Sequence, residues 1–404
     1  MPRKIVFINR YFYPDHSATS QLLSDLAFHL AKQNYDVSVI SSQQCYDDTT
    51  KRLSAREIKY DVNIYRVKTT SFGRTWLPGR VLDYLSYFFG MSWILLKILK
   101  TGDIVVVKTD PPLTSIFTIL IAKFRRAYHV NWVQDLFPEV VSAVGIKGIP
   151  TLFIRVLIYF RNVSFQRSNK TVVIGELMKR KLISQGLRED LIEIIPNWSD
   201  SNNIVPMEPE SNPLRKSWNL KGKFIVGYSG NMGRVHEFDT FIDAANKLKS
   251  HKDILFVFIG GGPLKPYIEK RITHYNLSNI LFFPYQPYNK LSESLSVPDI
   301  HLISLKSEVE GSCVPSKYYG IIASGRPAFY VGDAGGEISL ILNVDKTGIQ
   351  VDLGDFQNLV DKIKYLYSDA SVLEDLSNNA RKSFLDKYDK VHAMKKWHSL
   401  LQNM

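Results

Sequence analysis

The fold is decided by the stretch SEVEGSCVPSKYYGIIASGRP, residues 307–327. One apolar run of strand length, residues 300–305, precedes it, and another, residues 328–331, follows it. The stretch is therefore predicted to be a loop and a helix between two strands, with the helix beginning near Ser316. Unpaired backbone N–H groups at such a helix start, beside the Ser316 hydroxyl and the Lys317 ammonium, favour phosphate binding. A capped surface helix with scattered charges is the alternative.

Acidic residues come just before this predicted phosphate site. Glu308 and Glu310 lie upstream of Pro315 and Ser316, where their carboxylates could accept hydrogen bonds from hydroxyl groups of the molecule that carries the phosphate. A phosphate anchor beside a group that binds hydroxyls is suited to a nucleotide-sugar.

The rest of the chain repeats the same strand, turn and helix pattern. Residues 4–8 predict a buried strand, residues 21–33 an amphipathic helix and residues 37–40 a second strand, which is a βαβ unit of a parallel sheet. Residues 224–228 and 254–259 are further predicted strands, and each leads into a glycine-containing turn. The sequence thus predicts an α/β protein with two doubly wound, Rossmann-like domains. We place the first at residues 1–200 and the second at 201–385, with a C-terminal helix at 386–404 that crosses back to the first.

Length, cysteine count and charge restrict the function. The 404 residues are too many for one ordinary core, and two cysteines, Cys45 and Cys313, fit neither a disulfide framework nor a metal site. The N-terminal apolar run is too short for a secretory signal, so a cytoplasmic location is expected. The net charge is +12, and residues 1–200 hold 27 Lys and Arg against 17 Asp and Glu. An anionic partner is therefore expected to meet the first domain.

Residues 51–100 combine positive charge with aromatic residues. They hold ten Lys and Arg against three acidic residues, and Tyr84, Phe88, Phe89 and Trp93 lie in an apolar run too short to span a bilayer. A basic, aromatic helix of this kind can lie at the surface of an anionic membrane. The alternative is an ordinary helix packed on the sheet. Nucleic acid is not expected, because no nucleic-acid motif accompanies the charge.

Several polar residues follow predicted strands, at the edge where ligands of parallel sheets bind. His16 and Ser17 lie in the loop after the first strand, and Asp135 and Glu139 follow the strand at residues 130–133. His16 could equally be a loop or cap residue, and Glu139 could belong to the first turn of a helix. In the second domain, Arg234 follows a glycine turn and could neutralise a diphosphate.

Five pieces of sequence together resemble the retaining glycosyltransferases of the GT-B fold, family-four type, and most of all the bacterial branch that builds surface polysaccharides. They are DLFPE (135–139), IPN (195–197), SGNMG (229–233), GGGP (260–263) and residues 310–327. The resemblance extends over nearly the whole chain. It implies that the second domain binds the nucleotide-sugar, that the first binds the acceptor, and that transfer occurs in the cleft between them.

The resemblance also implies roles for individual residues. Phosphate contacts are expected from Gly230, Asn231, Arg234 and Lys317, and a contact with the donor sugar from Glu310. The other expected donor-binding residues are Ser17, Gly233, Gly262, Tyr285, Pro315, Ser316 and Glu337. The chain departs from the family pattern at three positions: Gly320 replaces the second glutamate of the donor loop, Gln134 a histidine and His236 a lysine.

The chemistry of glycosyl transfer leads to a predicted mechanism. Breaking the bond to the diphosphate leaves negative charge on the leaving oxygen, which Arg234 and Lys317 would stabilise. The sequence offers no clear pair of carboxylates for a covalent intermediate. We therefore predict attack on the same face by the acceptor hydroxyl, with Asp135 or Glu139 orienting the acceptor and with neither a metal nor another cofactor.

The predicted substrates are a UDP-linked sugar and a polyprenyl-diphosphate-linked sugar acceptor in the synthesis of O-antigen, capsule or exopolysaccharide, with the protein peripherally bound at the inner face of the membrane. Two alternatives remain open: a nucleotide-sugar 2-epimerase of the same fold, and a non-catalytic scaffold that docks on membranes.

Overall fold

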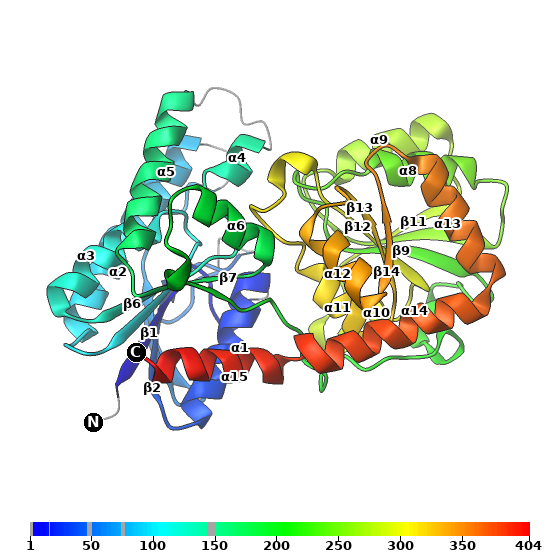
Figure 1. Cartoon of the computed structure of the whole chain (residues 1–404). Coiled ribbons are helices and arrows are strands. Elements are labelled where there is room, and N and C mark those ends of the chain that lie inside the picture. Colours follow the sequence, from blue (N-terminus) through cyan, green and yellow to red (C-terminus); the bar gives the residue numbers. More distant parts are fainter. Residues whose placement is uncertain (1–2, 16, 47–50, 74–76, 144–149) are drawn as a thin grey trace. The chain divides into compact units, whose positions relative to one another are not determined.

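The computed structural model describes residues 3–15, 17–46, 51–73, 77–143 and 150–404 and divides the chain into two compact units (Figure 1). Unit 1 consists of residues 1–196 together with 394–404, and unit 2 of residues 197–393. The first boundary between the units falls after Pro196. His16, a candidate site residue, lies outside the described residues.

Unit 1 is built on an eight-stranded sheet in which only the edge strand β3 is antiparallel. The central strands at residues 4–8 and 104–108 are apolar runs that are buried on both faces, as expected for a parallel sheet covered by helices. Phe7, at the centre of the sheet, pairs with Val39 on one side and Val106 on the other. In spatial order the strands are β3 (Arg56–Lys59), β4 (Val62–Val67), β2 (Asp36–Ser42), β1 (Lys4–Ile8), β5 (Ile104–Lys108), β6 (Tyr128–Trp132), β7 (Lys170–Val173) and β8 (Ile192–Ile194).

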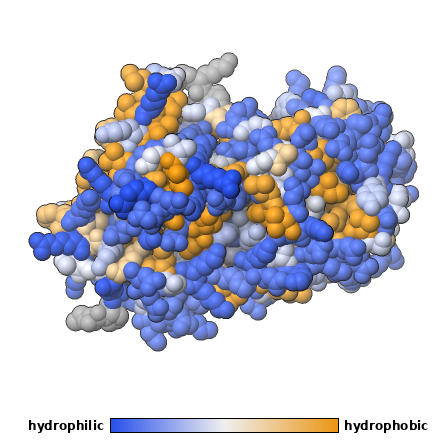
Figure 2. Space-filling model, in the orientation of Figure 1, coloured by the Kyte–Doolittle hydropathy of each residue, from blue (hydrophilic) through white to orange (hydrophobic). Residues whose placement is uncertain are grey.

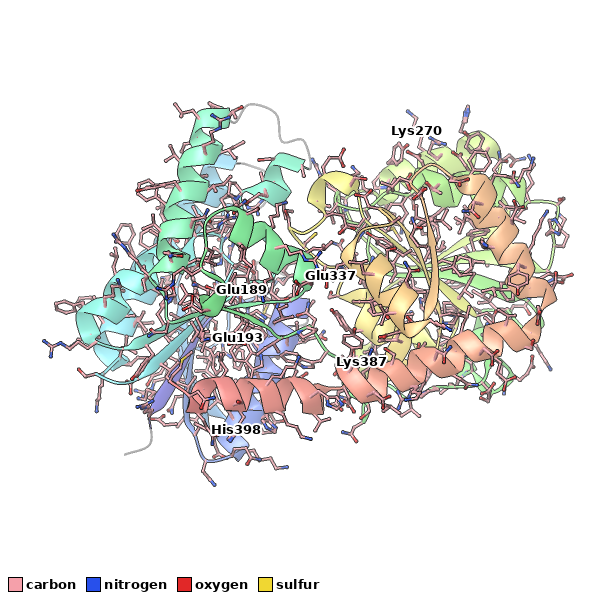
Figure 3. The ribbon with its side chains drawn as sticks, in the orientation of Figure 1. Glu189, Glu193, Lys270, Glu337, Lys387 and His398 are labelled. Carbon is pink, nitrogen blue, oxygen red and sulfur yellow. The ribbon has the colours of Figure 1, made fainter. Side chains whose placement is uncertain are left out.

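Helices cover the unit 1 sheet. They are α1 (Ala18–Lys32), α2 (Leu77–Ile98), α3 (Thr114–Arg125), α4 (Glu139–Ala143), α5 (Thr151–Gln166) and α6 (Glu176–Ser184). The buried face of α2, with Tyr87, Met91 and Leu95, packs on β1, β2 and β5. The last helix, α15 (Lys390–Gln402), places the Trp397 ring 4.8 Å from that of Trp132 and His398 within 3.2 Å of the Tyr35 hydroxyl (Figure 3).

Unit 2 contains a six-stranded sheet that is parallel throughout. Its order is β11 (Ile280–Phe283), β10 (Ile254–Gly261), β9 (Phe224–Asn231), β12 (Ile300–Ser304), β13 (Ala328–Val331) and β14 (Gly348–Val351). Its helices are α7 (Pro213–Ser217), α8 (Asp239–Lys247), α9 (Lys265–Tyr275), α10 (Leu291–Leu295), α11 (Lys317–Ala323), α12 (Glu337–Asp345), α13 (Phe356–Ser368) and α14 (Ala370–Ser383). The strand, turn and helix repeats therefore form two doubly wound α/β units, as the sequence predicted.

The core of unit 2 packs mainly under α8 and α13. Phe238 makes edge-on ring contacts with Tyr228 of β9, Phe258 of β10 and Phe241 of α8. Leu359 of α13 is fully buried in the same cluster. Aromatic pairs in this arrangement add stability beyond the area they bury. This packing fixes the carboxyl ends of β9 and β10, where the glycine turns lie.

Candidate active site

The glycine turns of unit 2 bring two strand ends unusually close together. Gly260 and Gly262 have φ values of +130° and +147°, in the region that favours glycine. A Cβ added at Gly260 would lie 2.3 Å from the Gly230 carbonyl oxygen, and one at Gly262 would lie 2.5 Å from Asn231 Oδ1. Larger residues would therefore push the ends of β9 and β10 apart. The turns present backbone groups at the carboxyl edge of the sheet, where ligands of such sheets bind.

Lys317 reaches the turn after β9 from the start of α11. Its Nζ donates to the Tyr228 hydroxyl, lies 3.4 Å from His236 Nε2, and is 3.8 Å from the centre of the Tyr228 ring. A Cβ at Gly230 would lie 3.8 Å from Lys317 Cε. Although the residue keeps some contact with solvent, its amine end is enclosed, and burial lowers its pKa well below the usual range.

Arg234 lies on the segment that joins β9 to α8 and its side chain is exposed. Within the part of the chain that the structure describes, it makes no ion pair. Gly233, just before it, packs on the Asn231 side chain, since an added Cβ would lie 3.2 Å from Asn231 Nδ2. The predicted phosphate residues thus occur together on one turn, with Lys317 beneath it.

Glu310 is held inside unit 2. Its carboxylate accepts a hydrogen bond from the Tyr330 hydroxyl, and its second oxygen lies 3.4 Å from the backbone nitrogen of Glu337 at the start of α12 (Figure 3). Burial raises the pKa of Glu310, although the bond from Tyr330 opposes this rise. Glu308, the other acidic candidate, is exposed, and Pro315 is buried beside exposed Ser316.

Tyr285 places an aromatic ring over the same edge of unit 2. Its ring would lie 3.1 Å from a Cβ at Gly260, and its hydroxyl donates to the Gly261 carbonyl at 3.3 Å. The side chain is nonetheless 58% exposed. An exposed ring face fixed beside a glycine turn is a suitable stacking surface for a flat group such as a nucleobase.

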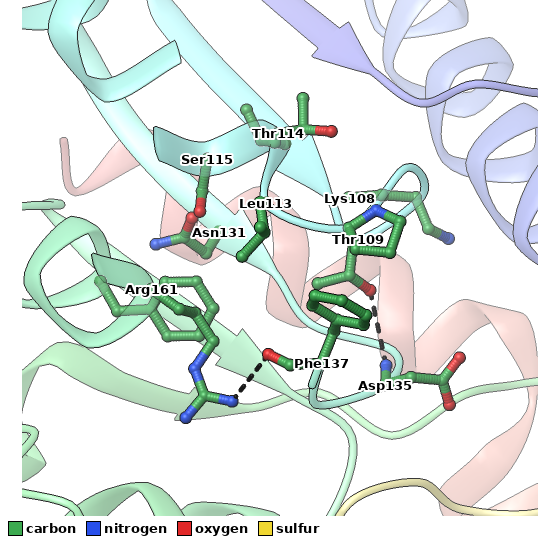
Figure 4. A pocket seen from close by; sticks show the side chains of 12 residues that line it. Lys108, Thr109, Leu113, Thr114, Ser115, Asn131, Asp135, Phe137 and Arg161 are labelled. Atoms are coloured by element: carbon green, nitrogen blue, oxygen red, sulfur yellow. Dashed lines mark hydrogen bonds between the residues drawn. The ribbon is translucent and has the colours of Figure 1, made fainter. Parts of the chain in front are cut away.

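In unit 1, polar residues gather at the carboxyl ends of β5 and β6. Lys108, Thr109 and Asp135 line a pocket together with Asn131 and Arg161 (Figure 4). The Thr109 hydroxyl accepts from the backbone nitrogens of Gln134 and Asp135, at 3.2 and 3.4 Å, and this holds the strand ends together. The predicted residue Asp135 therefore lies in the most polar part of this edge.

Asp135 has an altered acidity. Enclosure by protein atoms and then the Asp110 carboxylate raise its pKa to about 6, while Lys108 opposes the rise. Because the Asp135 side chain itself is exposed, water moderates the effect of enclosure. Lys108 is buried, donates to the Thr19 carbonyl at 3.0 Å, and lies 3.7 Å from the centre of the Trp132 ring. Burial lowers the pKa of Lys108, and the two aspartates counteract this.

Glu139 occurs in an ion pair. Its Oε2 accepts from Arg161 Nη1 at 2.5 Å, and its Oε1 accepts from Gln185 Nε2 at 2.9 Å. Arg161 also donates to the Phe137 carbonyl, which lies in the DLFPE motif. Both carboxylate oxygens therefore serve to hold α5 and α6 against this loop, in place of contacting a substrate.

Ser17, a predicted donor residue, lies in unit 1 just before α1. Its backbone nitrogen donates to Asp15 Oδ1 at 2.8 Å, and the other carboxylate oxygen of Asp15 accepts from the Tyr46 nitrogen at 2.5 Å. Ser17 Oγ has no hydrogen-bond partner among the described residues. Among those same residues, no cluster of His, Cys, Asp and Glu could hold a metal ion.

Residues 210–383 match the family model described as "Glycosyl transferases group 1". The chain carries a group 1 glycosyltransferase domain. The probable glycosyltransferase WbjE of Pseudomonas aeruginosa is 28% identical to this chain over 276 residues, 68% of each chain. The putative colanic acid biosynthesis glycosyl transferase WcaI of Escherichia coli is 28% identical over 219 residues, which span 53% of this chain and 54% of WcaI.

Solved structures confirm the predicted GT-B fold of this chain. HepE of Anabaena in complex with UDP and glucose aligns over all of both chains with a TM-score of 0.76 and 14% identity. Sucrose-phosphate synthase of Thermosynechococcus elongatus aligns over 99% of this chain and 98% of its own, with a TM-score of 0.80 and 13% identity. At such identities the likeness concerns the fold alone.

Three residues that matter for these sites, Lys108, Tyr228 and Arg161, were not among the site residues predicted from the sequence. Lys108 lies over an aromatic ring as Lys317 does, Tyr228 contacts Lys317, and Arg161 forms the ion pair with Glu139. Lys108 and Tyr228 carried a signal, since a polar residue near the end of an otherwise apolar strand points to the ligand edge. Arg161 carried none, because its partners are distant in sequence.

Proposed function

We propose that this protein is a retaining glycosyltransferase that moves a hexosyl or N-acetylhexosaminyl group from a UDP-sugar to a polyprenyl-diphosphate-linked acceptor in surface-polysaccharide synthesis. The observation that carries the proposal is Lys317 beneath the glycine turn of β9 in unit 2. A cation and backbone groups gathered at one point are what a departing diphosphate requires. The printed names of WbjE and WcaI, and the UDP and glucose in the HepE complex, support the choice of substrate class.

In the proposed mechanism, the bond between the sugar and the diphosphate breaks while the acceptor hydroxyl approaches on the same face. The leaving oxygen gains negative charge, which Lys317 and Arg234 stabilise. The departing phosphate accepts the proton of the acceptor hydroxyl. Asp135 orients that hydroxyl, a role for which Asp135 is better suited than Glu139, since Arg161 and Gln185 occupy both Glu139 oxygens.

The donor is tested by thermal stabilisation of the protein with a panel of nucleotide-sugars. A UDP-sugar is expected to raise the melting temperature, and Lys317→Ala is expected to abolish the rise. The control Lys290→Ala changes an exposed lysine of the same unit. Stabilisation by none of the panel would contradict the donor assignment.

The reaction is tested separately. Formation of an epimer when the protein is incubated with the donor alone would indicate the 2-epimerase instead. A product with the inverted anomeric configuration, or loss of turnover when chelators are added, would refute the mechanism.

The proposed membrane surface is formed by α2, α3 and α5 of unit 1. Residues Pro78–Ile98 of α2 are long and apolar enough to cross a bilayer, a test that buried core helices also pass. The packed face of α2 ties it to the sheet, which favours a helix lying along a membrane. Large apolar side chains are exposed on all three helices, and Figure 2 shows hydrophobic residues gathered over α5. They are Val81, Leu82, Leu85, Phe89, Trp93, Phe117, Leu120, Phe124, Leu152, Phe153, Val156, Tyr159 and Phe160.

Basic side chains accompany these apolar ones. Lys97, Lys123, Arg126 and Arg155 are all exposed on the same helices or at their ends. Exposed rings at headgroup level beside Lys and Arg are suited to anionic lipid. Sedimentation with anionic vesicles is expected to fall strongly in the double variant Phe89→Ser, Trp93→Ser. The matched control is Tyr365→Ser, an exposed aromatic residue of unit 2. Equal sedimentation of all three proteins would contradict the surface.

A further inference from the structure

The amine of Lys317 lies among neutral groups. Tyr228 of β9 and His236 of the following segment are its polar contacts, and the described residues give it no ion pair. Two carboxylates do approach α11, but they affect other groups: Glu337 raises the pKa of Tyr319, and Asp345 raises the pKa of Tyr318. Burial is the cause of the lowered pKa of Lys317, with no acidic group to offset it. Other titratable or charged groups near these elements include Lys306, His301 of β12, Tyr330 of β13, Glu310 of the loop before α11, Arg326, Arg381 of α14, Tyr388, Tyr285 and Arg234.

The hydrogen-bond directions show what His236 offers to Lys317. His236 Nδ1 lies 2.5 Å from the Ser304 carbonyl oxygen, and a carbonyl oxygen only accepts, so Nδ1 carries the hydrogen. His236 Nε2 therefore presents its lone pair to Lys317. Burial lowers the pKa of His236 to about 3, so that the imidazole is neutral at physiological pH.

Tyr228 also offers a lone pair. Its hydroxyl donates to the Asn231 carbonyl at 2.7 Å and accepts from Lys317. The Lys317 amine thus faces two acceptors, the oxygen of Tyr228 and Nε2 of His236. A neutral amine has two N–H groups, which these acceptors satisfy, whereas an ammonium has three. The third N–H and the full charge lack a partner in unit 2, and a phosphate oxygen would supply both needs.

We propose that Tyr228 and His236 hold Lys317 as a neutral amine in the free protein, and that the diphosphate of the donor brings a proton from solvent onto Lys317 when it binds. The lone pair of Nζ accepts that proton from a buffer acid, which keeps the electrons of the bond it loses, and the new N–H donates to a phosphate oxygen. The inference rests on the proposed function, because it takes the ligand to be a nucleoside diphosphate. The positive charge of Lys317 then appears beside the leaving group only when the donor is bound. Tyr228 and His236 act through Lys317, which makes them positioning residues.

Isothermal titration calorimetry with UDP tests the wild-type protein directly. We choose about pH 8.5, where a phosphate whose second pKa is about 6 carries no proton. In buffers of differing ionisation enthalpy, the heat of binding is expected to report uptake of close to one proton per UDP. The dissociation constant is expected to rise by up to about tenfold per pH unit above the pKa of free Lys317. A binding heat that is independent of the buffer would overturn the inference.

Variants assign the proton to Lys317. In Lys317→Arg the side chain is always protonated, so UDP is expected to bind without proton uptake. The control Lys290→Arg, on the surface of unit 2, is expected to take up the proton as the wild type does. Continued uptake in Lys317→Arg would place the proton elsewhere and refute the inference while leaving the donor assignment intact. Failure of the folded wild-type protein to bind UDP or any other nucleoside diphosphate would refute both.

Discussion

Replacing Glu139 with Gln is expected to destabilise unit 1 by about 3 kcal/mol. The carboxylate and Arg161 form an ion pair of 2.5 Å whose side chains are 12% and 4% exposed. Removing one charge of such a pair leaves the other buried without a counter-ion, which costs about 3–5 kcal/mol. We take the lower end because a glutamine oxygen can still accept from Arg161. The loss is measured by hydrogen exchange, which resolves units that unfold separately.

A loss of 3 kcal/mol should speed exchange of the slowest amides in β6 and α5 by about 100-fold, since each 1.4 kcal/mol is a factor of ten. Peptides of unit 2 provide the internal standard. The matched variant Glu176→Gln breaks an ion pair with Arg180 that is 44% and 67% exposed, and it should cost below about 0.5 kcal/mol. If Glu139→Gln loses transferase activity while exchange stays at the wild-type rate, Glu139 acts in the chemistry and our structural assignment is wrong.

The stability that the Glu139–Arg161 ion pair provides should also depend on pH. Burial alone would raise the pKa of Glu139, but Arg161 and Gln185 outweigh it and lower the pKa below the usual 4.5. A lowered folded-state pKa stabilises the fold fully above the unfolded value and loses that contribution as the pH falls through the folded value. The wild type should therefore lose its advantage over Glu139→Gln below about pH 4.5.

Three further outcomes are expected. Gly262→Ala should weaken donor binding and lower the melting temperature, because the added Cβ would lie 2.5 Å from Asn231 Oδ1. The control Gly335→Ala should change neither quantity, because a Cβ at Gly335 would meet open space. Transferase activity should rise with pH through a midpoint near 6, the pKa to which enclosure raises Asp135, and Asp135→Asn should remove that titration. Trp397→Ala, which empties a fully buried site, should cost unit 1 about 3–5 kcal/mol in urea unfolding.

The fold followed from the sequence because parallel strands carry their own signal. The runs at residues 4–8, 104–108 and 300–304 are apolar without alternation, and each is buried on both faces as predicted. The antiparallel hairpin of β3 and β4 was not predicted. Its turn residues, Tyr60 and Asp61, both adopt the positive φ that the turn requires. The pair Tyr-Asp is not one of the residue pairs, such as Asn-Gly, from which a hairpin turn is predicted.

The candidate sites were predictable where function depends on the backbone and less so where it depends on distant side chains. The glycines of the turns after β9 and β10 could be selected from spacing alone. Glu310, in contrast, was selected as a sugar contact, and nothing in its neighbours indicated that Tyr330 would hold its carboxylate. Tertiary hydrogen bonds of this type join residues about twenty positions apart, beyond the reach of local pattern analysis.

Two buried lysines at the carboxyl edges of the two sheets show why the donor site needs its ligand. Burial lowers the pKa of both Lys108 and Lys317, and each lies over an aromatic ring. Asp110 and Asp135 counteract the shift at Lys108, so the chain itself supplies negative charge there. No such group acts on Lys317, whose contacts are a phenol and an imidazole. If free Lys317 is neutral, as we propose, its cationic form requires a counter-ion from the bound ligand, and a diphosphate would provide that charge.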